Sequence, residues 1–345
     1  MQEDKADQII VAVDAMGGDN APLEIIKGSV DAVNKSRAVK VVLVGQEDVI
    51  RPVLSQFTWP EEQIKVRNAA EVISTEETPV MAVRKKKDSS IVVGERMVRN
   101  GEADAFVSAG STGAVLAGGS LIVGRLKGVE RTPLGALIPT AKGVAFLADS
   151  GANMDCKTSY LVQFARMGSI YMEHVMGVKN PRVALVNVGV EEEKGNAVVK
   201  EAYQLLKACK DMNFVGNIEA REIPAGGADV VICDGFVGNV VLKTYEGVSS
   251  VLIGEIKKAL LGSLRTKIGG ALIKPALKEM LKNFDTSEYG GAPMLGLNGL
   301  VVKTHGSAKA KEICNSILQC VTFKEQRIKE KIQENLTAGS ERCEE

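Results

Sequence analysis

Short apolar runs alternate along the chain with longer stretches in which apolar and polar residues mix. The runs are rich in Val, Ile and Leu and are continuous rather than alternating, which predicts strands buried on both faces, as in a parallel sheet. We expect these strands at 9–14, 39–45, 64–69, 104–109, 143–149, 182–188, 228–234 and 298–304. The stretches between them predict helices near 22–36, 46–57, 89–101, 112–124, 158–177, 195–211, 237–261, 274–284 and 307–335.

This order of elements, strand then helix repeated along the chain, is typical of an α/β fold with a doubly wound, mostly parallel sheet. We expect a polar tail over 1–8 and a single α/β/α catalytic domain over 9–325, with a division into two lobes around 120–150 left open. Residues 326–345 are charged and poor in apolar side chains after Leu336, which predicts a helix end that frays into a disordered tail.

Composition and charge exclude several classes of protein. Lys and Arg total 43, and so do Asp and Glu, so that no overall field attracts nucleic acid or a membrane. Aromatic residues make up 4% of the chain, which argues against base-stacking surfaces and a nucleic-acid partner. The polar N-terminus is unlike a signal peptide, and no apolar run reaches the roughly 18 residues of a spanning helix. Six scattered cysteines without metal-ligand spacing predict reduced thiols, no metal and a cytoplasmic location.

Glycine-rich loops follow several of the predicted strands, at the ends where ligands bind in open α/β sheets. These loops are DAMGGDNAP (14–22), SAGSTGA (108–114), DSGANMD (149–155), NVGVEEEKGN (187–196), DGFVGN (234–239) and YGGAP (289–293). Glycine lets backbone N–H groups approach an anion closely, and a helix N-terminus adds the positive end of its dipole. Any one loop is equally well a tight turn or a helix cap, but together they predict a single crevice that holds an anion.

The anion is not expected to be a dinucleotide or ATP, because neither the G-x-G-x-x-G spacing nor the Walker A pattern follows a strand. Protein nucleophiles are also scarce. Only two histidines occur, His174 and His305, and Cys156 has no evident base partner. A reaction whose nucleophile is already an anion, such as phosphate, needs positioning and charge stabilisation more than it needs a base.

Lys194 and Asn239 are the candidate catalytic residues. Lys194 stands close to a predicted helix start, where it binds phosphate or polarises a carbonyl unless it is simply an exposed lysine. Asn239 begins a long predicted helix and bonds a ligand or caps the helix. Asp14, Asp149 and Asp234 each end a strand, where carboxylates anchor loop N–H groups. The phosphate- and substrate-binding set is completed by Gly17, Gly18, Ser108, Gly110, Ser111, Thr112, Gly113, Asn153, Asn187 and Gly238.

Two further segments carry concentrated positive charge. The run Arg84, Lys85, Lys86, Lys87 is either a solvated face or a contact for an acidic partner or a phosphate. Residues 251–284 mix leucine and isoleucine with lysine, which predicts either a dimer-packing helix or a helix that touches anionic lipid. The apolar positions Leu252, Ile256, Leu260 and Leu264 share one helical face by their i, i+4 spacing.

The whole set of motifs resembles the bacterial phosphate acyltransferases of phospholipid synthesis, the PlsX family. The resemblance runs through VAVDAMGGDNAP, PVMAVRKKKDSSI, VSAGSTGA, SGANMDCK, VALVNVGVEEEKGN, FVGNIEARE, ADVVICDGFVGNVVLKTYEG, YGGAPMLGLNG and KTHGSA, and covers roughly 9 to 325. The chain departs from the family pattern at Asn20, where the family usually has His, and at Ser111, where it usually has Asn.

The resemblance implies a Rossmann-like α/β/α fold related to phosphotransacetylases and a homodimer that associates peripherally with the inner face of the membrane. It implies transfer of a long acyl chain from acyl carrier protein to inorganic phosphate, without a metal or nucleotide cofactor. The acyl phosphate then feeds a membrane glycerol-3-phosphate acyltransferase. The basic run at 84–87 suits acidic acyl carrier protein. Two alternatives stay open: a phosphotransacetylase-like enzyme that uses a CoA thioester, and a non-catalytic membrane scaffold for lipid-synthesis enzymes.

Overall fold

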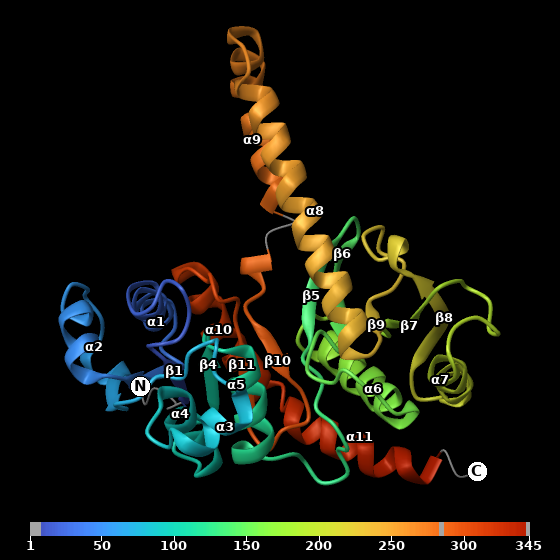
Figure 1. Cartoon of the computed structure of the whole chain (residues 1–345), viewed down its shortest axis with the longest axis horizontal. Helices are drawn as coiled ribbons and strands as arrows, with labels where there is room; N and C mark the ends of the chain where they lie inside the picture. The colour runs from blue at the N-terminus through green and yellow to red at the C-terminus, as the bar shows by residue number, and fades with distance from the viewer. Residues whose placement is uncertain (1–7, 283–285, 343–345) are drawn as a thin grey trace, which may run out of the picture.

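A computed structural model describes residues 8–282 and 286–342 and contains two sheets flanked by helices (Figure 1). The strands are β1 (Ile9–Asp14), β2 (Val39–Gly45), β3 (Ile64–Asn68), β4 (Ala105–Ser108), β5 (Ala136–Thr140), β6 (Gly143–Ala148), β7 (Arg182–Asn187), β8 (Asn213–Glu219), β9 (Val230–Ile232), β10 (Ala292–Met294) and β11 (Leu300–Lys303). The helices are α1 (Leu23–Lys35), α2 (Glu47–Leu54), α3 (Pro79–Lys85), α4 (Ser90–Arg99), α5 (Thr112–Gly118), α6 (Thr158–His174), α7 (Ala197–Ala208), α8 (Gly235–Leu261), α9 (Leu264–Lys282), α10 (Ala310–Glu325) and α11 (Ile328–Arg342). Residues 1–7 of the predicted tail and 343–345 lie outside this part of the chain.

The first sheet has the strand order β10-β11-β4-β1-β2-β3 and the second the order β5-β6-β9-β7-β8. All neighbouring strands are parallel except β10 with β11 and β5 with β6. This confirms the predicted α/β class with mostly parallel sheets. Each antiparallel partner, β10 or β5, lies at the edge of its sheet.

Helices cover both faces of each sheet because the strands are apolar on both sides. Val11 and Val13 of β1 belong to the core cluster that also holds α1 and α10, whereas Ala12 between them belongs to the cluster of α4 and α5. On the second sheet, α6 and α7 pack on one face, and the first turns of α8 pack on the other, with the Tyr245 hydroxyl donating to the carbonyl of Pro139 at 2.8 Å.

The segment before β5 joins the two sheets. Leu134 pairs with Met294 of β10. On either side of this pair, the amide of Gly135 donates to the carbonyl of Pro293 at 3.0 Å, and the amide of Leu295 donates to the carbonyl of Pro133 at 3.2 Å. The first sheet therefore connects to the second through backbone hydrogen bonds as well as through the continuous core beneath them.

Every predicted strand is present to within two residues at either end, but β5, β8 and β10 were not predicted. All three are edge strands, which are less buried and tolerate residues that interrupt central strands. Each carries such a residue: Pro139 in β5, Gly216 in β8 and Pro293 in β10. Their sequences consequently lack the continuous apolar run that identified the central strands.

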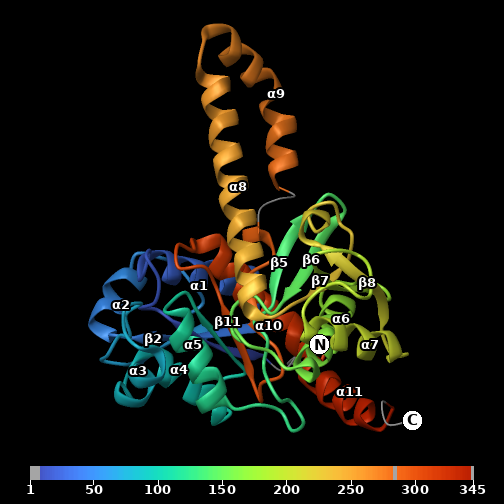
Figure 2. The ribbon, with the colours of Figure 1, turned by 45° about the vertical axis from the view of Figure 1, so that its right-hand side comes forward.

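The predicted helix at 307–335 is two helices, because Arg327 turns the chain with a φ of +52° between α10 and α11. Helix α11 crosses under α6, with Ile328 and Ile332 fully buried in the core, and it continues to Arg342, past Leu336. Helices α8 and α9 form a hairpin that projects well beyond the body of the molecule (Figure 2).

We predict that Phe146→Ala lowers the free energy of unfolding by about 3–5 kcal/mol, the usual cost of emptying a large buried aromatic site. Phe146 is fully buried in β6 and its ring stacks on Tyr171 with centroids 4.8 Å apart. Denaturant unfolding measures the change. Phe236→Ala is the matched control, because Phe236 is 64% exposed, and it should change the value by less than about 0.5 kcal/mol. Equal effects of the two substitutions would contradict this packing.

Candidate functional site

The glycine loops divide into two groups, one at the carboxyl ends of the strands of each sheet. Loops 14–22, 108–113 and 289–293 belong to the first sheet, and loops 149–155, 187–196 and 234–239 belong to the second. This division follows from the presence of two sheets, and strand order is not visible in local sequence patterns.

In the first-sheet group, the buried carboxylate of Asp14 holds two loops together. Its Oδ2 accepts a 2.7 Å hydrogen bond from the Ser108 hydroxyl, whose oxygen accepts from the Gly110 amide at 3.0 Å. Gly17 packs directly on this arrangement, since a Cβ there would lie 2.3 Å from Asp14 Oδ2 and 2.7 Å from the Gly110 amide nitrogen. Burial raises the pKa of Asp14, although hydrogen bonds from Ser90 and Ser108 oppose the shift.

Asn20 and Ser111, which are expected from the sequence to depart from the family pattern, both make hydrogen bonds in this group. The Asn20 amide donates to the carbonyls of Ser307 and Ala308 at 2.9 and 3.2 Å. The Ser111 hydroxyl caps α5 by accepting from the amide of Ala114 at 3.5 Å. Gly18 has a φ of +98°, and the next amide, of Asp19, donates to Gly306 at 2.7 Å, so that the loop after β11 joins the group.

The two remaining predicted residues of loop 108–113 differ in their surroundings. Thr112 is exposed at the start of α5, whereas Gly113 packs against Pro79, the first residue of α3, with a hypothetical Cβ 2.4 Å from the ring. The lack of a side chain at Gly113 therefore brings the basic helix α3 against the first turn of α5.

Two buried charged residues of this group were missed by the sequence analysis. Lys303 ends β11 and is 6% exposed; burial lowers its pKa to about 8, against the opposing effect of Glu312, Asp14 and Asp19. Glu95 of α4 is fully buried, and burial together with Asp14 raises its pKa well above its usual value. Lys303 follows Val301 and Val302 in a predicted buried strand, and Glu95 shares a helical face with Ile91, Val92 and Val98. A charged residue on a predicted buried face is the signal that could have found them.

In the second-sheet group, Asp149 is the organising carboxylate. It is fully buried and accepts hydrogen bonds from the amides of Leu134 at 2.9 Å and of Ala152 at 3.1 Å, and from the side-chain amide of Asn153 at 2.9 Å. Asn153 in turn donates to the carbonyl of Thr132 at 2.9 Å. These bonds tie the loop after β6 to the segment that joins the two sheets.

Helix α8 begins against this loop. Asp234 caps it by accepting from the amide of Val237 at 2.8 Å, and the Gly235 amide donates to the carbonyl of Asn153 at 2.6 Å. A Cβ at Gly238 would lie 1.9 Å from the Asp149 carbonyl oxygen, so only glycine permits this approach. The Asn239 amide nitrogen faces the same loop, 3.4 Å from the carbonyl oxygen of Ser150.

Lys194 stands on the loop between β7 and α7, and its backbone is fixed while its side chain is exposed. Asn187 donates to the carbonyl of Lys194 at 3.0 Å, and the next residue, Gly195, has a φ of +94° with no room for a Cβ beside Asn187. Within residues 8–282 and 286–342 the Lys194 ammonium makes no hydrogen bond or ion pair, so its charge is available to a ligand.

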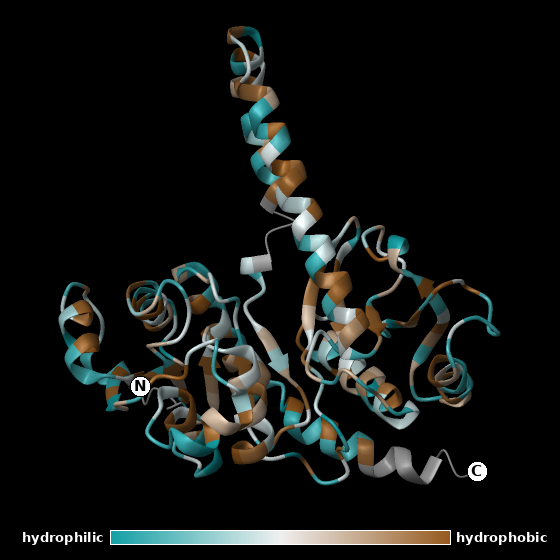
Figure 3. Cartoon of the chain, viewed as in Figure 1, coloured by the Kyte–Doolittle hydropathy of each residue, from teal (hydrophilic) through white to brown (hydrophobic). Residues whose placement is uncertain are grey.

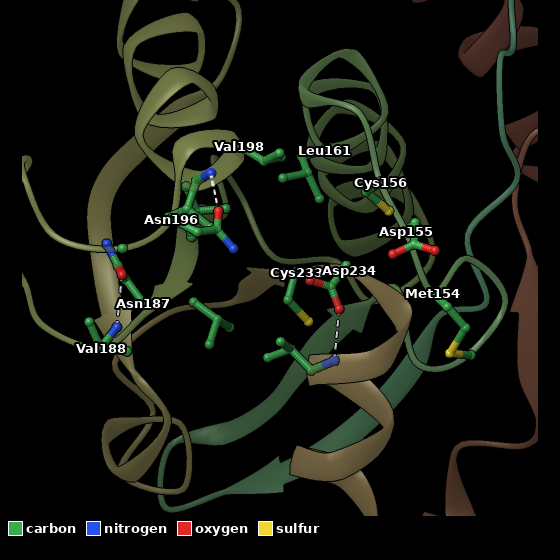
Figure 4. Close-up of a pocket in the computed structure, with 15 residues that line it drawn as sticks. Met154, Asp155, Cys156, Leu161, Asn187, Val188, Asn196, Val198, Cys233 and Asp234 are labelled. Carbon is green, nitrogen blue, oxygen red and sulfur yellow. Dashed lines mark hydrogen bonds between the residues drawn. The ribbon is translucent and has the colours of Figure 1, made fainter.

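A cavity of about 330 Å³ opens between this loop, the start of α8 and the loop after β6 (Figure 4). Of the predicted residues, Asn187 and Asp234 line it, whereas Lys194 only adjoins it through Gly195, and Asn239 lies on the other side of the α8 start. The structure does not bring these two candidates into contact. In the part of the chain that it describes, no three His, Cys, Asp or Glu side chains stand together as metal ligands.

The basic run at 84–87 is divided by the structure. Arg84, Lys85 and Lys87 are exposed at the end of α3. Lys86 instead forms a 2.7 Å ion pair with Glu77, and this bond lowers the pKa of Glu77. The Lys86 ammonium also donates to the carbonyl of Val72 at 2.7 Å. Lys86 therefore holds the loop before α3 rather than offering its charge to a partner.

The expected single face of Leu252, Ile256, Leu260 and Leu264 is wrong in one respect. Helix α8 ends at Leu261 and Leu264 begins α9, so helical spacing does not relate Leu264 to the other three. Leu260 lies inside the hairpin, where Gly270 of α9 approaches it; Leu252 and Leu264 are 59% and 76% exposed. Among the described residues no helix is both long enough and apolar enough to cross a membrane.

Comparison with solved structures identifies the class to which this fold belongs. A phosphotransacetylase from Streptococcus pyogenes superposes with a TM-score of 0.60 at 17% identity, covering 92% of this chain and 95% of that one. The EutD phosphotransacetylase from Staphylococcus aureus gives a TM-score of 0.58, also at 17% identity, over 92% and 94% of the two chains. The chain has the phosphotransacetylase fold.

Sequence comparison gives the family. The family model described as "Fatty acid synthesis protein" matches residues 9–331. A phosphate acyltransferase of Clostridium botulinum is 50% identical over 328 residues, 95% of this chain and 98% of the relative; that of Clostridium acetobutylicum is 48% identical over 95% and 99%. The chain belongs to this family of acyltransferases, which confirms the resemblance seen in its motifs.

The buried ammonium of Lys303 predicts a measurable pH dependence. Its pKa of about 8 in the folded protein lies below the ordinary value of 10.5, so between these pH values the unfolded chain binds more protons than the folded one. The free energy of unfolding of the wild type should therefore rise with pH relative to Lys303→Met, by about 1 kcal/mol per pH unit. Chemical unfolding at pH 7.5 to 10 measures the difference, and parallel curves would contradict a buried, charged Lys303.

Proposed function

We propose that the protein transfers a long fatty acyl chain from acyl carrier protein to inorganic phosphate, releasing acyl phosphate. The observation that carries this proposal is the pair of loop groups around Asp14 and Asp149, built from motifs of the phosphate acyltransferase family. A phosphate oxygen attacks the thioester carbonyl carbon, the C–S bond breaks, and the proton of hydrogen phosphate leaves with the thiol.

The chain's own groups supply positioning and charge in this step. The exposed ammonium of Lys194 binds the phosphate or stabilises the oxygen that becomes negative as the carbonyl is attacked. The side-chain amide of Asn239 assists at the other side of the α8 start, and the N–H groups of the loop 108–113 are the donors that the first-sheet group would contribute. The cysteines next to the cavity are poor nucleophiles, because burial and the nearby carboxylates raise the pKa of Cys156 to about 12 and that of Cys233 well above its usual value.

Acyl carrier protein is the proposed donor because Arg84, Lys85 and Lys87 are exposed at the end of α3, a helix whose first residue, Pro79, packs on the start of α5. An acidic partner that docks there would deliver its thioester close to the loop 108–113. A CoA thioester, as in a phosphotransacetylase, is the alternative donor. Rates with labelled phosphate and either thioester decide between them, and preference for CoA would overturn the proposed donor.

The hairpin of α8 and α9 supports peripheral association with the inner face of the membrane, or a homodimer interface. Apolar and polar residues are intermixed along both helices (Figure 3), and large apolar side chains are exposed at Val248, Val251, Leu252, Ile253, Ile256, Leu261, Leu264, Ile268, Leu272 and Ile273. Residues 252–284 carry seven Lys or Arg against two Glu. An apolar surface with excess positive charge suits anionic lipid, where the cytoplasmic enzyme would pass acyl phosphate to a membrane glycerol-3-phosphate acyltransferase.

We predict that Lys194→Ala lowers turnover by about tenfold to a thousandfold, the range for loss of one electrostatic group. The purified variant is assayed with labelled phosphate and an acyl thioester. Lys200→Ala, which removes another exposed lysine one turn into α7, is the control and should stay near the wild type. Near-wild-type turnover of Lys194→Ala would remove Lys194 from the mechanism, and no acyl phosphate from the wild type would favour the scaffold alternative.

We predict that Leu264→Glu weakens binding to vesicles of phosphatidylglycerol and phosphatidylcholine at least about tenfold, because a leucine leaves the apolar phase and a negative charge meets anionic lipid. Vesicle sedimentation measures binding, and light scattering measures the molecular mass. A lower mass with unchanged vesicle binding would assign the hairpin to dimer packing instead of lipid.

A further inference from the structure

The cavity over β7 and β9 has an apolar interior and a mixed rim, which carries apolar side chains together with Asp155, Asn187, Asn196 and Asp234. Its innermost residues are Leu161, Leu185 and Cys233, which are 2%, 0% and 4% exposed. At its mouth stand Val188 and Met154, whose side chains are 79% and 48% exposed (Figure 4). Exposed apolar groups that continue into a buried apolar pocket favour a ligand with a long apolar part.

The charges around the cavity argue against an anion inside it. Asp155 and Asp234 line it, and no described lining residue is Lys, Arg or His. The raised pKa of the Cys156 thiol reports the same negative surroundings, because the carboxylates of Asp149, Asp234 and Asp155 add to the effect of its burial. Phosphate would be repelled from this pocket, whereas an uncharged hydrocarbon would not.

The rim of the cavity is also the base of the Lys194 loop. Asn187 and Gly195 line the cavity, and the Asn187 side chain holds the carbonyl of Lys194. We propose that this cavity holds the hydrocarbon chain of the acyl thioester, so that the reacting carbonyl stops at the rim below Lys194. The assignment rests on the proposed function and adds to it the site that selects the length of the acyl chain.

The size of the cavity limits how much of a chain it accepts. A volume of about 330 Å³ accommodates roughly ten methylene groups if each takes about the 30 Å³ that a water molecule occupies in the liquid. Each methylene that enters should raise kcat/KM roughly fourfold. Beyond ten to twelve carbons or so the chain would extend past Val188 and Met154 into the open, and the increase should level off.

The first test is a chain-length profile, from butyryl to palmitoyl thioesters, for the wild type and two variants. Val198→Phe places a phenyl ring in the cavity from α7. If that variant unfolds below the assay temperature, Val199→Phe replaces it, because Val199 also lines the cavity. Val215→Phe is the matched control, because Val215 is 49% exposed on the edge strand β8 and lies outside the cavity lining.

We expect Val198→Phe to keep butyryl transfer within about twofold of the wild type and to lose at least about tenfold in kcat/KM for decanoyl and longer chains. The Val215→Phe profile should match the wild type. An unchanged profile for Val198→Phe would overturn the proposal. So would an equal loss at every length in a folded variant, since the cavity would then act on the reaction and not on the chain.

A second readout does not depend on turnover and separates this proposal from the proposed function. Cys156 lines the cavity and is half-buried, so an occupant should slow its alkylation by N-ethylmaleimide. Because the pKa of Cys156 is raised, this reaction is slow, and it is followed over hours at elevated pH by peptide mass spectrometry. We expect decan-1-ol, an uncharged probe, to slow alkylation at least about threefold in the wild type and not in Val198→Phe. If the wild type transfers no acyl group, the proposed function fails while this protection still supports a hydrocarbon pocket; absence of protection overturns the pocket itself.

Discussion

The carboxylate of Asp149 is the point on which the second-sheet site depends. It is buried at the end of β6, and it accepts hydrogen bonds from Leu134 and from the loop at 151–153, whose Asn153 donates to the carbonyl of Thr132. Its carbonyl oxygen is covered by Gly238 of α8, which fits only without a side chain. One residue thus fixes the start of α8, the rim of the cavity and the link to the first sheet, where Asp14 holds two further loops in a similar way.

The cavity and its rim near Lys194 differ in charge and polarity. Near the cavity, carboxylates and buried thiols make the surroundings negative and apolar, which suits a hydrocarbon and keeps Cys156 and Cys233 protonated. The exposed ammonium of Lys194 offers positive charge next to the rim, to which it is joined through Gly195. Under the proposed function, an anionic nucleophile would be drawn to Lys194 and excluded from the pocket, so the phosphate and the chain of a thioester would meet at the carbonyl carbon.

Most of the strands and the loops that carry the site residues could be predicted from the sequence, because buried parallel strands and glycine-rich loops leave local sequence patterns. Eight apolar runs identified their strands, seven in the interior of a sheet and β3 at an edge, and Asp14, Asp149, Asn187 and Asp234 stand where four of these runs end. The edge strands β5, β8 and β10 were missed because Pro139, Gly216 and Pro293 interrupt their apolar runs. The division of the loops between two sheets depends on strand order, and the cavity depends on how α6 and α7 pack; neither is encoded in local spacing.

The proposed mechanism requires phosphate itself to be the nucleophile, with no acyl group held covalently by the protein. The direct test is to mix the protein with a stoichiometric amount of acyl thioester, first without phosphate and then with it, while following thiol release and the mass of the protein. We expect no release of thiol and no change in mass until phosphate is added, and acyl phosphate together with free thiol afterwards. A stoichiometric burst of thiol without phosphate, with one acyl group added to the protein, would contradict it.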